Sequence, residues 1–415
     1  MTPRRAAWSA LLLALLAVLP YLRTFQLPFI SDDYLLLDYS RKWGPVSGWP
    51  DLFADVLYRS RTTSVILTWW IQLAAGLEAW PYQAASLALH VFNTWLVAML
   101  GSWPRIGWKI SVPAAAFFAV HEIHQEAVLW YSALPELLVF LFIAVSFLLT
   151  VRGHFWPAFA AYALALLSKE SAVVVLPFLA LPLWLKGVGW PRIALRLTPH
   201  IALTVAYAWP IFAAGASHLH LRDGTFDLTA PFWITASVSF ARLLWVWGAL
   251  SLAVLWLRRR QAAWPIAFSG LVWMAAALLP YSFLTYMHRA PSRHTYLAGL
   301  GVALLVGCAW TLAASQWRRT AAALAVICVL HNSVYVWLWK HPQYLRRAQP
   351  TETLVRYVRQ HRGPFALTCW PYSRLVAEST VRVASGGRDG TVQWAAAPEI
   401  PAICIDEAGG LIVQQ

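Results

Sequence analysis

Charged side chains are scarce in this chain of 415 residues, since Asp, Glu, Lys and Arg make up only 12% of it. Soluble proteins carry about 25%. Acidic residues are the scarcest, with 18 Asp and Glu against 32 Lys and Arg, while hydrophobic residues reach 60%. This composition excludes a soluble globular protein and predicts an integral membrane protein that crosses the bilayer many times.

Other absences narrow the function further. The sequence has no glycine-rich phosphate-binding loop, which argues against a nucleotide substrate. It also has no zinc-type spacing of Cys and His. The net charge of +14 does not indicate nucleic-acid binding, because the Lys and Arg residues form short clusters between apolar runs, as membrane topology requires.

The four cysteines fall into two pairs with different surroundings. Cys308 and Cys328 lie in apolar runs, where a free thiol acts as a small packing residue. Cys369 and Cys404 lie in the polar C-terminal tail, and they could form a disulfide if that tail lies outside the cytoplasm. The sequence alone leaves this pairing open.

Eleven apolar runs predict membrane spans, although several are shorter than the ~20 residues that a full crossing needs. They lie near residues 7–23, 82–101, 110–121, 132–150, 155–169, 171–185, 198–215, 232–257, 262–281, 296–315 and 320–338. If a twelfth run, 63–79, does not cross, every basic connector falls on the side of Arg4 and Arg5, as the cytoplasmic side requires. We therefore interpret 63–79 as a re-entrant or interfacial helix. The N-terminus is then a cytoplasmic, uncleaved signal-anchor, and the C-terminus lies outside.

The predicted fold is an all-α polytopic membrane domain, residues 1–344, followed by a small extramembrane α/β domain, residues 345–415. In the second part an amphipathic helical pattern precedes short apolar runs between Gly and Pro turns, which is typical of strands. A unit of this size has a marginal core. We therefore expect it to dock on the membrane part.

The polar motifs all fall in the remaining connectors, which this topology places on one external face. The first is the pair Asp32–Asp33, shortly after the first span. Acids are costly beside a membrane, and we interpret the pair as the place where a proton is removed from an incoming substrate. The alternative is a helix cap, because Ser31 before the two acids is a good signal for a helix N-terminus.

Further charged residues follow on the same face. Arg59 either binds a phosphate group or snorkels at the membrane interface. Lys169 and Glu170 form either a structural ion pair or a phosphate-binding position. Arg293 adds positive charge in the last polar connector.

The segment HEIHQEAV, residues 121–128, is the most specific cluster. His121 and His124 would share one face of a helix, and Glu126 follows them. These three residues are candidates for a divalent metal site, although three ligands so close in sequence rarely complete one. The alternative is substrate positioning and proton transfer. His90 and Asn93 lie inside an apolar run, where a hydrogen-bonded core pair is the favoured interpretation.

These motifs, in this order, resemble the integral-membrane glycosyltransferases of the GT-C fold, in particular the protein O-mannosyltransferase-like branch, which includes the mannosyltransferases fused to tetratricopeptide repeats. The motifs are Asp32–Asp33, Tyr58–Arg59, HxxN from His90, HxIHxEAV from His121, LSKE ending at Glu170 and SRxxYL from Ser292, within residues 5–340. The sequence departs from the family where Ser60 replaces a usual Pro after Arg59, where Glu122 replaces a Pro after His121, and where a small tail replaces the repeats.

The resemblance implies a polyprenyl-phosphate sugar donor, an acid after the first span as general base, and inversion at the anomeric carbon. It assigns the base to Asp32 or Asp33 and phosphate binding to Arg59, Lys169 and Arg293. It implies no firm metal requirement. The full predicted set of substrate-binding residues is Arg59, His121, His124, Glu126, Lys169, Glu170 and Arg293.

The sequence thus predicts a membrane glycosyltransferase that moves mannose, or another hexose or pentose, to a hydroxyl or amine of a protein, glycan or lipid acceptor. The expected partners are the polyprenyl-phosphate donor, the acceptor and membrane lipid, without nucleic acid. A bacterial inner membrane with a periplasmic site is favoured, and an endoplasmic reticulum membrane with a luminal site would look the same. A flippase or transporter of lipid-linked glycans, a polysaccharide polymerase or ligase, and an inactive scaffold are the alternatives.

Overall fold

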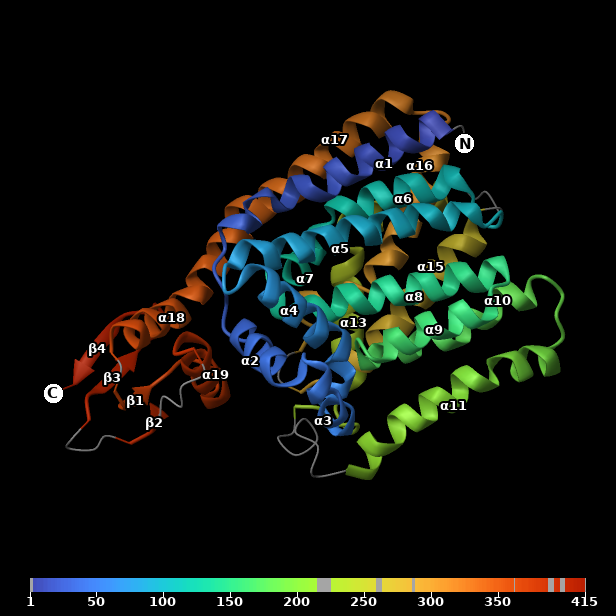
Figure 1. The fold of residues 1–415 in the computed structure, drawn as a ribbon. Coiled ribbons are helices and arrows are strands. Elements are labelled where there is room, and N and C mark those ends of the chain that lie inside the picture. The colour runs from blue at the N-terminus through green and yellow to red at the C-terminus, as the bar shows by residue number, and fades with distance from the viewer. Residues whose placement is uncertain are drawn as a thin grey trace.

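The computed structural model describes residues 3–214, 225–258, 263–285, 288–361, 363–386, 392–395 and 400–414. Figure 1 shows a bundle of helices followed by a small sheet at the C-terminal end, at the left of the view. The helices before the sheet are α1 (Pro3–Val18), α2 (Asp33–Trp43), α3 (Trp49–Ala54), α4 (Thr62–Ala75), α5 (Ala79–Met99), α6 (Trp108–Val120), α7 (Gln125–Leu129), α8 (Leu134–Arg152), α9 (Phe155–Leu166), α10 (Leu176–Trp184), α11 (Trp190–Ala214), α13 (Phe232–Leu244), α14 (Trp247–Arg258), α15 (Trp264–Leu278), α16 (Gly299–Ala314), α17 (Arg318–Tyr335) and α18 (His341–Gln360). The structure confirms the predicted order, in which apolar helices are followed by a small α/β part.

Within the described residues, six helical segments are long and apolar enough to cross a membrane. They are Arg4–Gln26, Ala79–Ser102, Tyr131–Arg152, Trp190–Ala214, Trp264–Tyr281 and Arg318–Gln360, and the bent pair α13–α14 would be a seventh. Four shorter apolar helices, Trp108–Val120, Phe155–Leu166, Glu170–Trp184 and Gly299–Ala314, coincide with the other predicted spans. The count of eleven crossings stays a prediction, because these four are shorter than the ~20 residues that a crossing needs.

The polar connectors gather at one end of the bundle. In Figure 1, α2, α3 and the C-terminal sheet lie at the left, whereas the N-terminus and the connection from α10 to α11 lie at the right. Arg4, Arg5 and Lys186 belong to this second end. The segment 63–79 forms α4, whose 14 residues are also too few for a crossing. This arrangement agrees with the predicted separation of basic loops and polar motifs, while the side that faces the cytoplasm stays a prediction.

The last span continues directly into the C-terminal part. α17, a π-helical turn (Val336–Lys340) and α18 form one helical segment of 43 residues, Arg318–Gln360. The proposed domain boundary at residue 344 lies inside this segment and stays a prediction. Beyond it, the sheet has the strand order β2-β1-β3-β4, with β1 and β3 parallel and β3 and β4 antiparallel. The strands are β1 (Phe365–Cys369), β2 (Val392–Gln393), β3 (Ala402–Ile405) and β4 (Leu411–Gln414).

The small α/β part docks on α2, as we expected from its size. Its helix α19 (Arg374–Ala384) carries Arg382, which pairs with Asp38 of α2 at 2.7 Å. The Ser379 hydroxyl donates to the same carboxylate at 2.9 Å. Val383 of α19 and Val355 of α18 enter a buried apolar cluster formed with residues of α2, α5 and α8. Apolar burial and a charged pair therefore fix this part against α2 and the adjoining ends of α5 and α8.

A disulfide joins Cys369 of β1 to Cys404 of β3. The pairing that the sequence left open is therefore present in the structure. Cys308 and Cys328 are free and buried, as predicted for packing residues. The disulfide closes a loop of 35 residues that contains α19 and β2.

Replacing Cys404 with Ser should loosen the small domain while leaving the helical bundle folded. A cross-link over a loop of this length stabilises by about 3–4 kcal/mol, mainly by restricting the unfolded chain. We expect limited proteolysis of the purified protein to cut within residues 363–414 many times faster than in the wild type. Cys308→Ala, which removes a free thiol, is the matched control. Equal cleavage rates in Cys404→Ser and wild type would show that packing alone holds this domain.

Candidate active site

Asp33, the first residue of α2, is completely buried. One of its carboxylate oxygens accepts the backbone N–H of Ile30 at 2.8 Å, and the other accepts the N–H of Ser132 at 2.6 Å. Burial raises the pKa of Asp33 to about 8, against the opposing effect of these two donors. Because both oxygens are bound to the backbone, Asp33 fixes the local chain and is poorly placed to meet a substrate.

Asp32 has a different environment from its neighbour, because its side chain is only partly buried. Its Oδ1 accepts the Ser31 hydroxyl at 3.1 Å, while its other oxygen has no hydrogen-bond partner within the described residues. Burial raises the pKa of Asp32, and the positive charges of Arg293 and Arg347 lower it again. Ser31 has a φ of +47°, which non-glycine residues rarely adopt and which often marks functional sites. Asp32 is therefore the member of the pair that a substrate could reach.

The two arginines that act electrostatically on Asp32 both lie over the ring of Trp130. The guanidinium carbon of Arg293 lies 4.8 Å from the ring centroid, and that of Arg347 lies 4.4 Å from it. Glu126 accepts from the Arg293 side chain at 2.7 Å and from its backbone N–H at 3.2 Å. Among the ion pairs of the described residues, none involves Arg347. We name these five residues the acid site.

Trp130 is held in place by its own indole N–H, which donates to the carbonyl oxygen of Ile30 at 3.1 Å. Ile30 is also the residue whose N–H binds Asp33. The ring and the Asp32 loop are therefore positioned together. Arg347 has no ion-pair partner among the described residues, so this group could hold an anion near the Asp32 carboxylate.

A second charged group lies in the interior beside η10, the short 3-10 helix Ser292–Thr295. Lys169 donates to the Glu136 carboxylate, and His294 Nδ1 lies 2.6 Å from the same oxygen. The Tyr281 hydroxyl donates to the other oxygen of Glu136 at 3.3 Å, and its ring stacks on His294. Glu136 is 1% exposed and Lys169 is 6% exposed. We name these four residues the buried ion cluster.

The buried ion cluster fixes the position of Arg293. Arg293 and His294 are adjacent in η10, so the contacts of His294 with Glu136 anchor the segment that presents Arg293 to the acid site. The Lys169 ammonium neutralises Glu136, so the structural alternative, an ion pair of Lys169 with Glu170, is wrong in its partner, because Glu170 pairs with Arg61. The predicted phosphate contact of Lys169 stays a prediction, as a buried pair is costly to break.

Arg59 and Glu170 lie in a third group around η3 (Tyr58–Arg61). Glu170 pairs with Arg61 at 2.9 Å and accepts the Ser60 hydroxyl at 2.7 Å, so its main cation is Arg61. Arg59 donates to the carbonyl oxygen of Tyr207 on α11, and its guanidinium lies 5.1 Å from that ring. The described contacts of Arg59 are thus with α11, and its phosphate-binding role stays a prediction.

His121 and His124 are both buried, and their rings meet edge to face with centroids 5.5 Å apart. His124 Nδ1 lies 3.0 Å from the Phe118 carbonyl oxygen, and Glu126 is engaged by Arg293. The two imidazole rings thus contact each other, while Glu126 is held by Arg293. Within the part of the chain that the structure describes, no three His, Cys, Asp or Glu side chains are placed to share a metal ion.

His90 and Asn93 form the core pair that the sequence favoured. His90 Nδ1 lies 2.9 Å from the Tyr296 hydroxyl, and the Asn93 amide donates to the same hydroxyl at 3.2 Å. Both residues are fully buried. Tyr296 follows η10, so this pair also holds the segment that carries Arg293.

Sequence reasoning missed Trp130, Glu136 and Arg347. A signal existed for Glu136, because it is a lone acid at the start of the apolar run 132–150, and ionisable residues in a membrane are functional candidates. Arg347 gave no such signal. It is one of several arginines in an amphipathic helix that we had assigned to the tail, away from the site.

No protein-family model and no curated protein sequence matches the chain. Two solved structures resemble it, both of ArnT from Cupriavidus metallidurans. The form bound to undecaprenyl phosphate aligns with a TM-score of 0.55 and 13% identity over 96% of this chain and 92% of that chain. The apo form aligns with a TM-score of 0.51 and 14% identity over 97% and 93%. At this identity the likeness shows the fold alone, so the chain shares the fold of ArnT.

Proposed function

We propose that this protein is a membrane glycosyltransferase that moves a sugar from a polyprenyl-phosphate donor to an acceptor, with Asp32 as the general base. The observation that carries the proposal is the unequal environment of the two acids. Asp33 is bound by backbone N–H groups on both oxygens, whereas Asp32 has a hydrogen bond on only one oxygen within the described residues and feels the positive charges of Arg293 and Arg347. The resemblance allowed either acid as the general base, and we assign this role to Asp32.

The proposed reaction is a single displacement at the anomeric carbon. An acceptor hydroxyl or amine transfers its proton to Asp32 while its lone pair forms the new bond to that carbon. The bond between the anomeric carbon and the phosphate oxygen breaks at the same time, and its electron pair leaves with the polyprenyl phosphate. Attack from the side opposite the phosphate inverts the configuration. Mannose as the sugar follows only from the resemblance.

Arg293 and Arg347 suit the leaving phosphate because guanidinium groups bind phosphate oxygens with two parallel hydrogen bonds. Positive charge placed where negative charge develops also lowers the barrier. The fold supports the lipid part of the proposal, since ArnT with the same fold was solved with undecaprenyl phosphate bound. Arg59 and Lys169 are proposed as further cations along the donor path.

An external location of the site is part of the proposal. Disulfides persist in oxidising compartments, and the Cys369–Cys404 bond lies in the domain that contacts α2, at the end of the bundle that carries the acid site. The N-terminal arginines lie at the other end, as a cytoplasmic N-terminus requires. A bacterial inner membrane with the site facing the periplasm fits these observations.

Replacing Asp32 with Asn should abolish transfer while leaving the fold intact. Loss of a general base lowers kcat by about 10²–10⁴-fold. The measurement is transfer of radiolabelled sugar from synthetic polyprenyl-phosphate donors by the purified protein in detergent, with donor binding followed separately. Donor affinity should change little, because the two arginines remain.

Asp33→Asn is the matched comparison, and it should lower the stability of the folded protein. The Asn amide would place an N–H group against a backbone N–H, and a buried donor without a partner costs about 1–3 kcal/mol. We expect a lower Tm for Asp33→Asn and an unchanged Tm for Asp32→Asn. Full turnover in Asp32→Asn would remove this residue from the mechanism.

Replacing Arg347 with Gln should move the acid limb of the pH–rate profile to higher pH. Asp32 acts as a base only when ionised, so the rate rises with pH through its pKa. Arg347 lowers that pKa, so the loss of Arg347 should raise the pKa of Asp32. Arg346→Gln, an exposed neighbour on the same helix, is the control. The same acid limb in both variants would contradict an electrostatic role for Arg347 at Asp32.

A further inference from the structure

Most of the acid site is fixed by the helical bundle. The Asp33 carboxylate anchors the loop that carries Asp32. Glu126 holds Arg293 by an ion pair. Arg347 differs, because none of the ion pairs of the described residues involves it. The position of its guanidinium group therefore depends on how firmly α18 is held.

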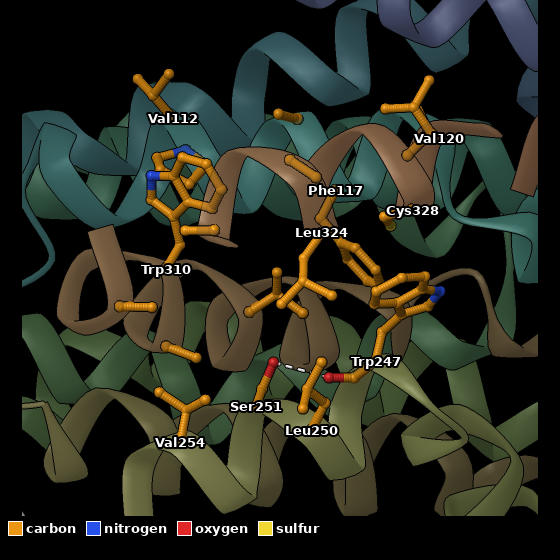
Figure 2. Close-up of a pocket in the computed structure, with 18 of the residues that line it drawn as sticks. Val112, Phe117, Val120, Trp247, Leu250, Ser251, Val254, Trp310, Leu324 and Cys328 are labelled. Atoms are coloured by element: carbon orange, nitrogen blue, oxygen red, sulfur yellow. Dashed lines mark hydrogen bonds between the residues drawn. The ribbon is translucent and has the colours of Figure 1, made fainter. Parts of the chain in front are cut away.

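The long helix that carries Arg347 is irregular on both sides of this residue. Its membrane part, α17, borders an apolar groove of about 390 Å³, across which Figure 2 shows Leu324 facing α6 and α14. A π-helical turn, Val336–Lys340, separates α17 from α18. Pro350 lies inside α18 and has no N–H group, so it removes the helical hydrogen bond to the Arg346 carbonyl oxygen. Such irregular turns are places where helices bend.

The small α/β domain contacts α18 at this weak point. The Tyr372 hydroxyl donates to the backbone carbonyl oxygen of Arg347 at 2.5 Å. Tyr372 also interacts electrostatically with Arg347 and with Asp32, so it lies near both charges. A second segment of the domain contacts the same helix, because the Thr353 hydroxyl donates to the Gly409 carbonyl oxygen at 2.9 Å. Two separate segments of the domain therefore hold α18.

Helix α19 connects the two helices that contribute to the acid site. Figure 1 shows it between α18 and α2, and it packs against both. Arg382 of α19 pairs with Asp38 of α2. Val381 of α19 shares an apolar core with Leu354 of α18. The domain therefore sets the spacing between the helix that follows Asp32 and the helix that carries the acid-site arginine.

The disulfide Cys369–Cys404 joins the two segments that hold α18. Tyr372 follows Cys369 by three residues, and Gly409 follows Cys404 by five. The strands that carry the two cysteines are short, with five residues in β1 and four in β3. Both cysteines are half-buried, so a small reductant can reach the bond. We name Tyr372, Gly409 and α19 the clamp.

We propose that the clamp is closed by the Cys369–Cys404 disulfide, that Tyr372 is a positioning residue for Arg347, and that the redox state of the disulfide controls the acid site. Reduction opens the clamp and slows sugar transfer, and reoxidation restores it. The effect on transfer rests on the proposed function, whereas the clamp itself does not.

The switching step is thiol–disulfide exchange with a dithiol. One thiolate of the dithiol attacks a sulfur of the protein disulfide, which releases the other cysteine as a thiolate and leaves a mixed disulfide. The second thiolate of the dithiol then closes the disulfide of the reductant and frees the remaining cysteine. The protein gains two electrons and two protons, and the dithiol loses them. Accessible disulfides are the ones that undergo this exchange readily.

The clamp acts on Asp32 through charge. The titratable and charged groups around Asp32 are Arg293 of η10, Arg347 of α18, the neighbouring Asp33, and Tyr372 of the small domain. Both arginines lower the pKa of Asp32. An open clamp releases Arg347 while Arg293 stays in place, so the pKa of Asp32 rises. Because the base acts only when ionised, the acid limb of the pH–rate profile then moves to higher pH.

The clamp is tested by hydrogen–deuterium exchange of the full-length protein in lipid nanodiscs, with and without dithiothreitol. We expect peptides within residues 344–355 to exchange several-fold faster in the reduced protein, while peptides of α5 and α8 stay unchanged. Cys404→Ser should show the faster exchange without reductant and no further response to it. Cys308→Ala, which keeps the disulfide, should respond as the wild type does. Equal exchange in the oxidised and reduced wild type would overturn the clamp.

The positioning role of Tyr372 is tested by the pH–rate profile of sugar transfer. Tyr372→Phe keeps the ring and removes the hydroxyl that donates to Arg347, so the acid limb should move to higher pH, as in Arg347→Gln. Combining the two substitutions should add no further shift, because Tyr372 acts through Arg347. Tyr357→Phe, which removes a hydroxyl from the core of the same domain, is the matched control. A wild-type acid limb in Tyr372→Phe would overturn the positioning role, whatever its Tm.

Transfer by the oxidised and the reduced wild type connects the clamp to the proposed function. On the acid limb we expect the rate to fall several-fold on reduction and to recover on reoxidation, and Cys404→Ser should ignore the reductant. The same profile in both redox states would overturn the control of the site, while the proposed function would stand. If no form of the protein transfers sugar, the proposed function fails, and the exchange measurements still decide the clamp.

Discussion

The rest of the site depends on the buried carboxylate of Asp33. Its two oxygens bind the N–H groups of Ile30 and Ser132, and so join segments 99 residues apart in the sequence. An acid in such a position is stable only when hydrogen bonds replace its lost hydration. The same contact brings the Asp32 loop next to the α7–α8 connection, where Trp130 lies. The adjacent acids thus differ in their contacts, since Asp33 holds the loop together while Asp32 is the proposed base.

The bundle has surroundings of low polarity, so its buried ion pairs also determine how the site is arranged. In water an exposed ion pair contributes little, but Glu136 and Lys169 are almost fully buried and would be costly alone. Their pairing, together with His294, fixes η10 and hence the direction of Arg293. The acid site is therefore aligned by interactions that lie deeper in the protein than the site itself.

Much of this architecture could be predicted from the sequence, because apolar runs and basic connectors follow simple membrane rules. Within the described residues the eleven runs are helical, and Arg293 links Glu126, by an ion pair, to Asp32, by its charge, in the candidate site. The roles of Asp32 and Asp33 were not separable, since they depend on a backbone N–H far along the chain. The position of Arg347 could not be predicted from the sequence either. Its place beside Trp130 follows from the exact course of α18, which no local pattern encodes.

The continuous helix from Arg318 to Gln360 has a mechanical consequence. A helix transmits rotation along its length, so a change in the tilt of the last span moves Arg347 with it. Helices adjust their tilt when bilayer thickness differs from their apolar length. We therefore expect the electrostatic field at Asp32 to depend on the thickness of the surrounding membrane, through a helix that begins at the opposite end of the bundle.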